Sequence, residues 1–266
     1  METKEQLLKE LDIIKKWEED QSDLWFWEKL GRLPFKLLDK ITPQFLHNKI
    51  GTLLDELGGY IQNGGKYLVS EKNILKDLEN EIGQPIENME EVKDIPLYTM
   101  EKVCQKVMHQ RKKLATVQGA STGIGGIFTL AIDIPAILAL SLKTLQEIAI
   151  IHGYDPNEKN ERVFIVKCLQ FSSADIVGKR AILNDLSSLN REGAKSGEMI
   201  SQLQGWREVV YTYRDNFGWK KLFQMIPIAG LIFGAFTNRS MINDLSEVGI
   251  MLYRKRRILE RLNRID

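Results

Sequence analysis

One apolar run limits what this chain can fold into: nineteen residues, Ile124–Leu142, carry a single charge, Asp133, near their middle. The run is long enough to cross the hydrocarbon of a bilayer as a helix. Its isoleucines, leucines and phenylalanine favour insertion by about 4 to 5 kcal/mol, but a central aspartate opposes it by roughly 2.5 to 3.5 kcal/mol. Gly125, Gly126 and Pro135 add further penalties. We therefore expect a buried core helix, with an interfacial or re-entrant segment and a true span as the alternatives.

The glycine-rich stretch that leads into this run, Gly119–Gly126, has the spacing of a dinucleotide-binding turn. Such a turn needs a β-strand before it and a helix whose N-terminus faces the pyrophosphate. Here the preceding residues, KVMHQRKKLATVQ, have the pattern of a charged helix, and no acidic residue ends a second strand about 20 residues further on. We predict a bend that connects two helices, with no nucleotide bound.

The rest of the chain repeats apolar residues at helical spacing, and no run of period-two alternation is flanked by turn signals. Thr42 and Pro43, for example, give a helix N-cap followed by proline at the first helical position. A second apolar run, Leu222–Phe236, has fifteen residues and suits a core helix or an interfacial segment. We predict an all-α fold: a single multi-helix domain, 1–266, with two central glycine-rich apolar helices and a candidate internal linker at 84–96.

The composition is that of a folded protein, with 43% hydrophobic and 27% charged residues. A formal net charge of +1 gives no reason to expect a nucleic-acid partner. Cys104 and Cys168 lack the spacing of a metal site and indicate a reducing compartment. The first residues, METKEQLLKELDIIKKWEED, lack the apolar core of a secretory signal, so we expect a cytoplasmic protein.

The central sequence GASTGIGGIFTLAIDIPAILALSLKTLQEIAIIHGYDP resembles the EcsC family. The shared elements are a glycine-rich turn, an Asp-Ile-Pro triplet, a Glu-Ile pair and a Gly-Tyr-Asp ending: Gly119–Gly126, Asp133–Pro135, Glu147–Ile148 and Gly153–Asp155. The C-terminal part is similar to the end of that family, with matching residues Pro227, Gly230, Gly234 and Asn238 before the basic stretch Arg254–Arg257. The resemblance covers roughly Trp17 to Ile258.

This resemblance implies a bacterial protein that is cytoplasmic or peripheral to the inner face of the cell membrane. The family is named for a protein encoded beside the ATPase and permease of an ABC transporter, so a transporter is an implied partner. It supplies no enzymatic activity, cofactor or metal that could be carried over to residues of this chain.

Four polar residues in or near the central motif are candidates for a site: Asp133, Glu147, His152 and Asp155. A buried carboxylate is costly unless it is paired or hydrogen-bonded, so Asp133 either caps a helix that begins near Pro135 or faces a pocket as a functional acid. On one straight helix, Glu147 would lie about 21 Å along the axis from Asp133, so these acids cannot act as a pair. The spacing fits no metal motif and no serine has the surroundings of a nucleophile, so we assign no catalytic residue, cofactor or metal.

Two groups of side chains are candidates for contact with a membrane surface. Trp25 and Trp27 could anchor at the headgroup level, although packing on the core is the alternative. The basic tail contributes four more candidates: Arg254, Lys255, Arg256 and Arg257. These cations could bind anionic lipid, at about 1 kcal/mol each near the surface. Their alternative role is a solvated helix end that offsets the helix dipole.

These features favour a non-enzymatic accessory protein at the cytoplasmic membrane face, with a membrane surface or a membrane-protein partner such as an ABC transporter. The alternative is an uncharacterised enzyme or ligand-binding protein with a site around Asp133 and Glu147. The two hypotheses require different structures. The enzyme needs a pocket that gathers the four polar candidates, whereas the accessory protein needs an exposed apolar patch rimmed by lysine and arginine.

Overall fold

The computed structural model describes residues 2–21, 58–64, 69–123, 127–173, 179, 182–183, 186 and 227–265. Its helices are α1 (Lys4–Gln21), α5 (Glu71–Ile82), α6 (Met89–Val92), α7 (Leu97–Gly123), α8 (Ile127–Ile151), α9 (Lys159–Ser173) and α13 (Pro227–Ile265), and residues 58–63 are also helical. No β-strand occurs within these ranges. The prediction of an all-α fold is therefore confirmed.

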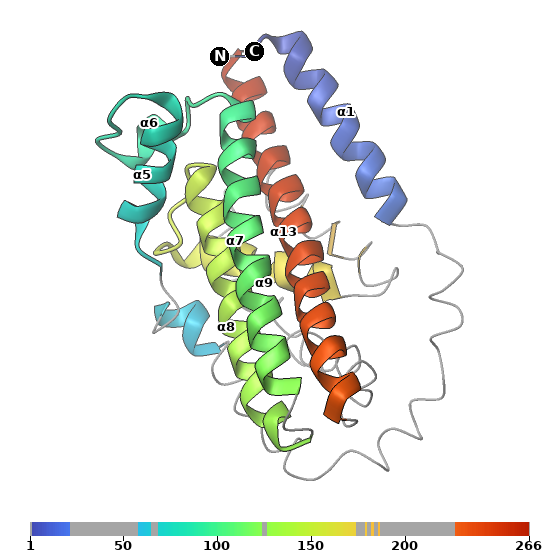
Figure 1. Ribbon diagram of the computed structural model, residues 1–266. Coiled ribbons are helices and arrows are strands. Elements are labelled where there is room, and N and C mark those ends of the chain that lie inside the picture. The colour runs from blue at the N-terminus through green and yellow to red at the C-terminus, as the bar shows by residue number, and fades with distance from the viewer. Residues whose placement is uncertain are drawn as a thin grey trace.

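Three long helices, α7, α8 and α13, form the body of the molecule (Figure 1). α7 packs along α13 in the opposite direction, and α8 returns beside α7, so that it runs parallel to α13. α9 packs against α8 and α13, α5 against α7 and α8, and α1 along α13. The bundle has two distinct ends: the chain termini lie at one with the end of α8, and the junction of α7 with α8 lies at the other with the start of α13 (Figure 1).

Most of the glycine-rich stretch belongs to α7. That helix continues through Gly119 and ends at Gly123, and α8 begins at Ile127. A dinucleotide-binding turn needs a β-strand at this point, and the described residues before Gly119 are helical instead. The sequence pattern of glycines therefore matches such a turn only in spacing.

The interpretation of Asp133 as a helix N-cap is wrong. α8 begins at Ile127, so Asp133 and Pro135 both lie inside the helix. A polar residue shortly before a proline resembles a helix start, but the preceding residues, IFTLAI, extend the helical pattern, and the helix tolerates the proline within it. None of the described helices combines the length and the apolar composition needed to cross a bilayer.

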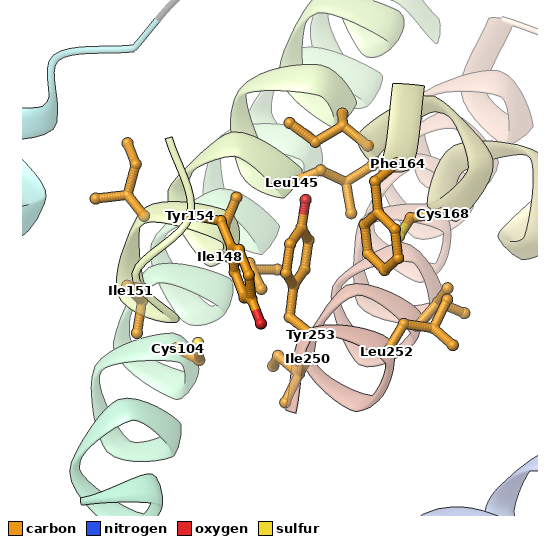
Figure 2. Close-up of a cluster of buried hydrophobic side chains, with 14 of the residues drawn as sticks. Cys104, Leu145, Ile148, Ile151, Tyr154, Phe164, Cys168, Ile250, Leu252 and Tyr253 are labelled. Carbon is orange, nitrogen blue, oxygen red and sulfur yellow. The ribbon is translucent and has the colours of Figure 1, made fainter. Parts of the chain in front are cut away.

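The centre of the core lies where α8, α9 and α13 meet (Figure 2). Tyr253 is fully buried there, with its ring centroid 4.9 Å from that of Phe164 and 5.5 Å from that of Tyr154. Gly249, one turn earlier on α13, permits close approach to α8, because a Cβ at this position would lie 2.8 Å from Leu145 Cδ2. Buried hydrophobic residues of α1, α5, α7, α8, α9 and α13 all belong to this one cluster.

The candidate linker at 84–96 is an ordered part of the bundle. The side chain of Asn88 accepts two backbone N–H groups and so caps the one-turn helix α6. Ile86, Val92 and Ile95 are buried in the same hydrophobic cluster as the helices on either side. The segment therefore joins α5 to α7 within one core, and part of its polar sequence serves to cap a helix.

Candidate functional site

The Gly-Tyr-Asp sequence ends α8, and the backbone shows why glycine is needed there. Gly153 has a φ of 77°, in the left-handed region that glycine adopts without steric cost. Its N–H donates to Ile150 O at 2.9 Å, and the N–H of Tyr154 donates to Ala149 O at 3.0 Å. These two bonds form a Schellman motif, which stops the helix and turns the chain towards α9.

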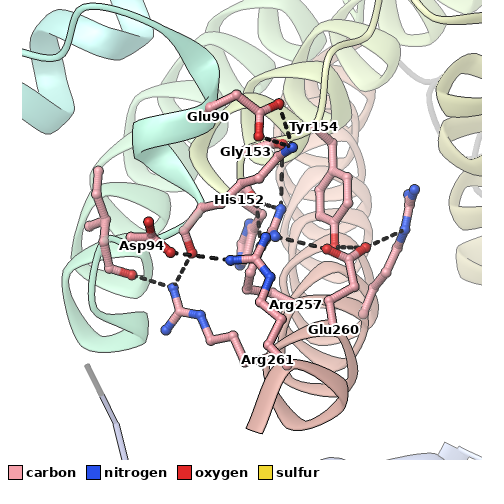
Figure 3. Close-up of polar contacts among 12 residues, drawn as sticks. Glu90, Asp94, His152, Gly153, Tyr154, Arg257, Glu260 and Arg261 are labelled. Carbon is pink, nitrogen blue, oxygen red and sulfur yellow. Dashed lines mark hydrogen bonds and ion pairs between the residues drawn. The ribbon is translucent and has the colours of Figure 1, made fainter.

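Arg257 of α13 completes this helix end (Figure 3). The side chain is fully buried, and its Nε and Nη2 donate to His152 O at 2.9 and 2.5 Å. Nη2 also donates to Gly153 O at 3.4 Å, and Nη1 pairs with Glu260 at 2.8 Å. The guanidinium thus donates hydrogen bonds to carbonyls at the end of α8, and its positive charge interacts favourably with the negative end of the helix dipole.

Arg261, one turn further along α13, binds the connection between α6 and α7 in the same way. Its Nη2 donates to Lys93 O at 2.7 Å and to Ile95 O at 2.6 Å, and its Nη1 pairs with Glu2 at 2.5 Å. Glu2 also accepts the backbone N–H of Leu97, the first residue of α7, at 2.6 Å. Burial lowers the pKa of Arg261, and the Glu2 carboxylate opposes that shift. These bonds hold the N-terminus, the start of α7 and the end of α13 together.

Arg256 pairs with a carboxylate inside the bundle. Glu161 of α9 is 3% exposed and accepts from Arg256 Nη1 at 2.7 Å and from the Tyr253 hydroxyl at 2.5 Å. Burial raises the pKa of Glu161, and its two donors oppose the shift. The Arg256 guanidinium also lies 4.0 Å from the centroid of the Tyr154 ring and 4.9 Å from that of Phe164, which is cation–π geometry.

His152 lies among these contacts and is 1% exposed. Its Nδ1 lies 2.8 Å from Ile148 O, and because a carbonyl can only accept, Nδ1 carries the proton. Burial lowers the pKa of His152 to about 3, and the charge of Arg257 acts in the same direction. The imidazole is therefore neutral at pH 7, and it stacks on Tyr253 with ring centroids 5.9 Å apart. We call this region, built around Arg254, Arg256, Arg257 and Arg261, the arginine end.

The arginine end joins the Gly-Tyr-Asp ending of the central motif to the basic stretch of the C-terminal helix. A model of the EcsC protein family matches residues 8–258, which include both. The chain belongs to the EcsC family. The geometry above therefore describes how two sequence elements of an EcsC protein meet in space.

Two relatives come from Bacillus subtilis (strain 168). The EcsC protein described here is 56% identical to the protein named "Uncharacterized protein YdbA" over 100% of its own length and 97% of that relative. It is 27% identical to "Protein EcsC" over 59% of its own length and 64% of that protein. No solved structure matches the chain.

Two acids of the EcsC motif, Asp133 and Glu147, lie far apart on α8. Glu147 is buried and pairs with Arg111 of α7, whose Nε donates to Oε2 at 2.7 Å. Asp133 lies in the first half of α8, fourteen residues away, which is about 21 Å along the helix axis. The structure therefore does not bring these two acids into one site.

The other two polar candidates also have partners of their own. His152 binds the carbonyl of its own helix, as described above, and Asp155 accepts the backbone and side-chain N–H groups of Asn157 at 2.8 and 2.7 Å. Within the described ranges, no group of three His, Cys, Asp or Glu side chains is arranged to hold a metal. Glu147 thus stabilises a helix pair, His152 a helix end and Asp155 a turn.

The four cations of the basic tail all form ion pairs within the bundle, and one of them is buried and three are half-buried: Arg257, and Arg254, Lys255 and Arg256. The sequence offered these residues as candidates for membrane contact or as a solvated helix end, and the structure gives each of them an acidic partner within the protein. Arg254 bridges two helices, pairing with Glu10 of α1 at 2.6 Å and with Glu101 of α7 at 2.8 Å. Lys255 pairs with Glu18 of α1 at 2.7 Å. The reason is that the fold brings acids of α1, α7 and α9 against this part of α13.

The two tryptophans that are candidates for a membrane anchor or for packing on the core, Trp25 and Trp27, lie outside the described residues. Trp17 of α1 is described, and it attaches that helix to the bundle. Its ring centroid lies 5.8 Å from that of Phe171, and its Nε1 donates to Glu247 at 2.8 Å. An N-terminal tryptophan of the EcsC pattern therefore serves packing.

Sequence reasoning overlooked Arg111, although a signal for it was present. Met100, Cys104 and Val107 form the buried stripe of α7, and Arg111 continues that stripe at helical spacing. A cation on an apolar stripe needs a buried acid, because an unpaired charge is costly in such a place. Glu147, on the next helix, is that acid.

Proposed function

We propose that this EcsC protein is a non-enzymatic accessory protein that acts at the cytoplasmic face of a membrane. The observation that carries the proposal is the composition of one end of the bundle. Three helical segments end or begin there: 114–123 of α7, 127–142 of α8 and 227–238 of α13 (Figure 1). Together they contain one ionisable residue, Asp133. We call this region the apolar end.

The contacts of the polar side chains support a role without catalysis. Glu147 and His152 are buried and hold helices in place. Cys104 and Cys168 are free and buried, and burial raises the pKa of both thiols, so that they are protonated and unreactive at neutral pH. The residue types that a catalytic site would use are thus engaged in structure at these positions.

The location and the partner belong to the same proposal. Two buried, unpaired thiols agree with a reducing compartment, which favours the cytoplasmic side. The apolar end favours contact with a lipid or protein surface, because charge-poor regions are typical of such contacts. The family resemblance adds an ABC transporter as the membrane protein with which the chain works.

Cell fractionation tests where the protein acts. A tagged chain at its native level should sediment with membranes and be released by alkaline carbonate without detergent, as a peripheral protein is. A chain found entirely in the supernatant of a gentle lysis would contradict the proposal.

A double substitution separates the proposal from the enzyme alternative. Arg111→Leu with Glu147→Leu replaces a buried ion pair by apolar side chains, a change that buried pairs often tolerate. An accessory protein should still complement a deletion when the double variant reaches normal abundance. Loss of complementation at normal abundance would favour an enzyme or ligand-binding site that uses the Glu147 carboxylate.

A further inference from the structure

We infer that α7 carries a second docking site for a helix, and that this site binds an amphipathic helix of another protein with a carboxylate beside its apolar stripe. We call residues Lys113–Val117 of α7 the second site. The inference goes beyond the proposed function, because it concerns a protein partner and does not depend on contact with a membrane.

The helix α5 shows what this side of α7 binds. α5 lies beside the first half of α7, where Lys102 pairs with Glu81 (Figure 1). One turn further along α7, Lys106 Nζ lies 2.6 Å from Asp77 Oδ1. Val103 is 2% exposed and belongs to the same hydrophobic cluster as the buried residues of α5. This part of α7, Lys102–Lys106, is therefore a first site, which holds an amphipathic helix by an apolar contact and two ion pairs.

The pattern of the first site recurs eleven residues further along α7. Eleven residues make about three turns of a helix, so residues with this spacing share a face and lie about 16 Å apart along the axis. Lys113 stands where the first site has Lys102, and Leu114 stands where it has Val103. The second site therefore repeats a lysine beside an apolar residue on the same side of the helix.

Burial shows that the two sites have the same orientation and differ in what covers them. Cys104 in the first site and Ala115, its equivalent in the second, are both fully buried. Val103 is also buried, whereas Leu114 and Val117 are 50% and 69% exposed. A helix that lay on the second site as α5 lies on the first would cover both of these exposed side chains. The second site is thus an open apolar surface in the phase of an occupied one.

The charges of the second site select its occupant. From Gln110 to Ser121, α7 contains three cations and no acid. Lys113 is exposed and forms no ion pair with a described residue. A second copy that docked with the same face would bring lysine against lysine, because a two-fold interface pairs each patch with itself. A helix with a carboxylate at the position of Glu81 would instead repeat the ion pair of the first site, so the occupant is an acidic amphipathic helix of a different protein.

A stapled peptide with the sequence of residues 70–83, which form α5 and its caps, serves as the probe. The staple joins positions 72 and 76, which are exposed in α5, and it pre-organises a helix that is too short to be stable alone. The peptide carries Asp77→Leu, because the second site has Val117 where the first has Lys106. Fluorescence anisotropy of the labelled peptide with the purified full chain should show saturable binding.

Charge exchange tests the predicted ion pair. Lys113→Glu should weaken binding of the peptide about tenfold, because two carboxylates then face each other. A peptide that also carries Glu81→Lys should bind this variant as tightly as the first peptide binds the wild type, since the two charges are then exchanged. Recovery of this kind depends on the pairing of these two residues and not on a general loss of folding.

An apolar variant and a matched control test the rest of the site. Leu114→Ser with Val117→Ser should weaken binding about tenfold or more, because it removes the exposed apolar surface. Leu8 and Ile13 of α1 are 49% and 51% exposed, so Leu8→Ser with Ile13→Ser removes comparable side chains elsewhere. This control should bind within roughly twofold of the wild type.

Two results would overturn the inference. One is the absence of saturable binding, which would mean that the second site has no affinity for such a helix or is covered by other residues of the chain. The other is equal binding by the wild type and the variants of the second site, which is the result expected if the peptide only displaces α5.

The inference and the proposed function fail in different ways. A chain that binds the peptide but stays in the supernatant of lysed cells keeps the second site and loses the proposed function. A chain that sediments with cell membranes but does not bind the peptide keeps the proposed function and loses the second site.

Discussion

The arginine end and the apolar end use basic residues in opposite ways. At the arginine end, Arg257 and Arg261 are buried, and their charges meet helix-end carbonyls and glutamates of other elements. Beside the apolar end, Lys113 and Arg239 are exposed and form no ion pair with a described residue. A basic stretch in a sequence is therefore a poor guide to a basic surface. What decides the role of each cation is which acids and helix ends the fold places beside it.

The largest expected effect tests whether the arginine end holds the bundle together. Arg257→Ala leaves the carbonyls of His152 and Gly153 without their donor and opens a cavity, so we expect a loss of about 3 to 5 kcal/mol in the free energy of unfolding. Urea denaturation measures this loss. Arg264→Ala is the control on the same helix: its side chain is 53% exposed and pairs with Asp94 at 3.3 Å, and we expect a change below about 1 kcal/mol. Similar losses in the two variants would remove the distinction between buried and exposed arginines.

Acid should weaken the arginine end through His152. The folded protein keeps this imidazole neutral because burial lowers its pKa to about 3, whereas the unfolded chain takes up a proton below the usual pKa of about 6.5. The contribution of His152 to the free energy of unfolding is thus fully present above pH 6.5 and is lost as the pH falls towards 3. Between pH 7 and pH 4.5 the loss amounts to about 3 kcal/mol.

The variant His152→Gln separates the pH-dependent contribution of His152 to stability from those of the other titrating groups. Burial raises the pKa of Glu161, which contributes in the opposite direction as the pH falls, but the wild type and His152→Gln both carry that residue. Denaturation at several pH values should show a steeper loss for the wild type than for His152→Gln. Parallel pH profiles would mean that His152 is not held neutral by its surroundings.

Two glycines separate backbone strain from crowding. Gly153 and Gly83 both have a positive φ, 77° and 72°. A Cβ at Gly153 would lie 3.0 Å from Lys93 Cγ and 3.1 Å from Arg257 Nη2, whereas a Cβ at Gly83 would meet no atom within 4 Å. Gly83→Ala should therefore cost about 1 kcal/mol from strain, and Gly153→Ala about 1 kcal/mol more. Thermal unfolding of the two variants compares them. An equal cost would show that Arg257 and Lys93 move aside freely.

The smallest expected effect belongs to three cations that border the apolar end. Neutralising Lys113, Lys143 or Arg239 to glutamine should change the free energy of unfolding by no more than about 0.5 kcal/mol each, since these side chains hold no described acid. Urea denaturation of the single variants measures this directly. A large loss from any of these variants would mean that these three cations stabilise the fold, as the arginine end does.

The fold class and the end of α8 could be predicted because both depend on local sequence. Apolar residues at helical spacing give the helices, and Gly153 stops α8 because its backbone needs a positive φ. The family could be predicted from the same motif, and residues 8–258 match it. The start of α8 was misjudged, because the pattern around Asp133 and Pro135 resembles a cap although the helix already begins at Ile127.

The sequence by itself determined that the chain is helical, that α8 stops at Gly153, and that 114–123, 127–142 and 227–238 carry almost no charge. Only the tertiary structure decided which charges are used internally. Arg257 and Arg261 lie on α13 far along the chain from the carbonyls of His152 and Ile95 that they bind. Nothing in the local sequence of α13 specifies those partners, because a buried guanidinium is stabilised by groups that folding brings to it. The same antiparallel packing gathers three charge-poor segments, separate in the sequence, at one end of the bundle.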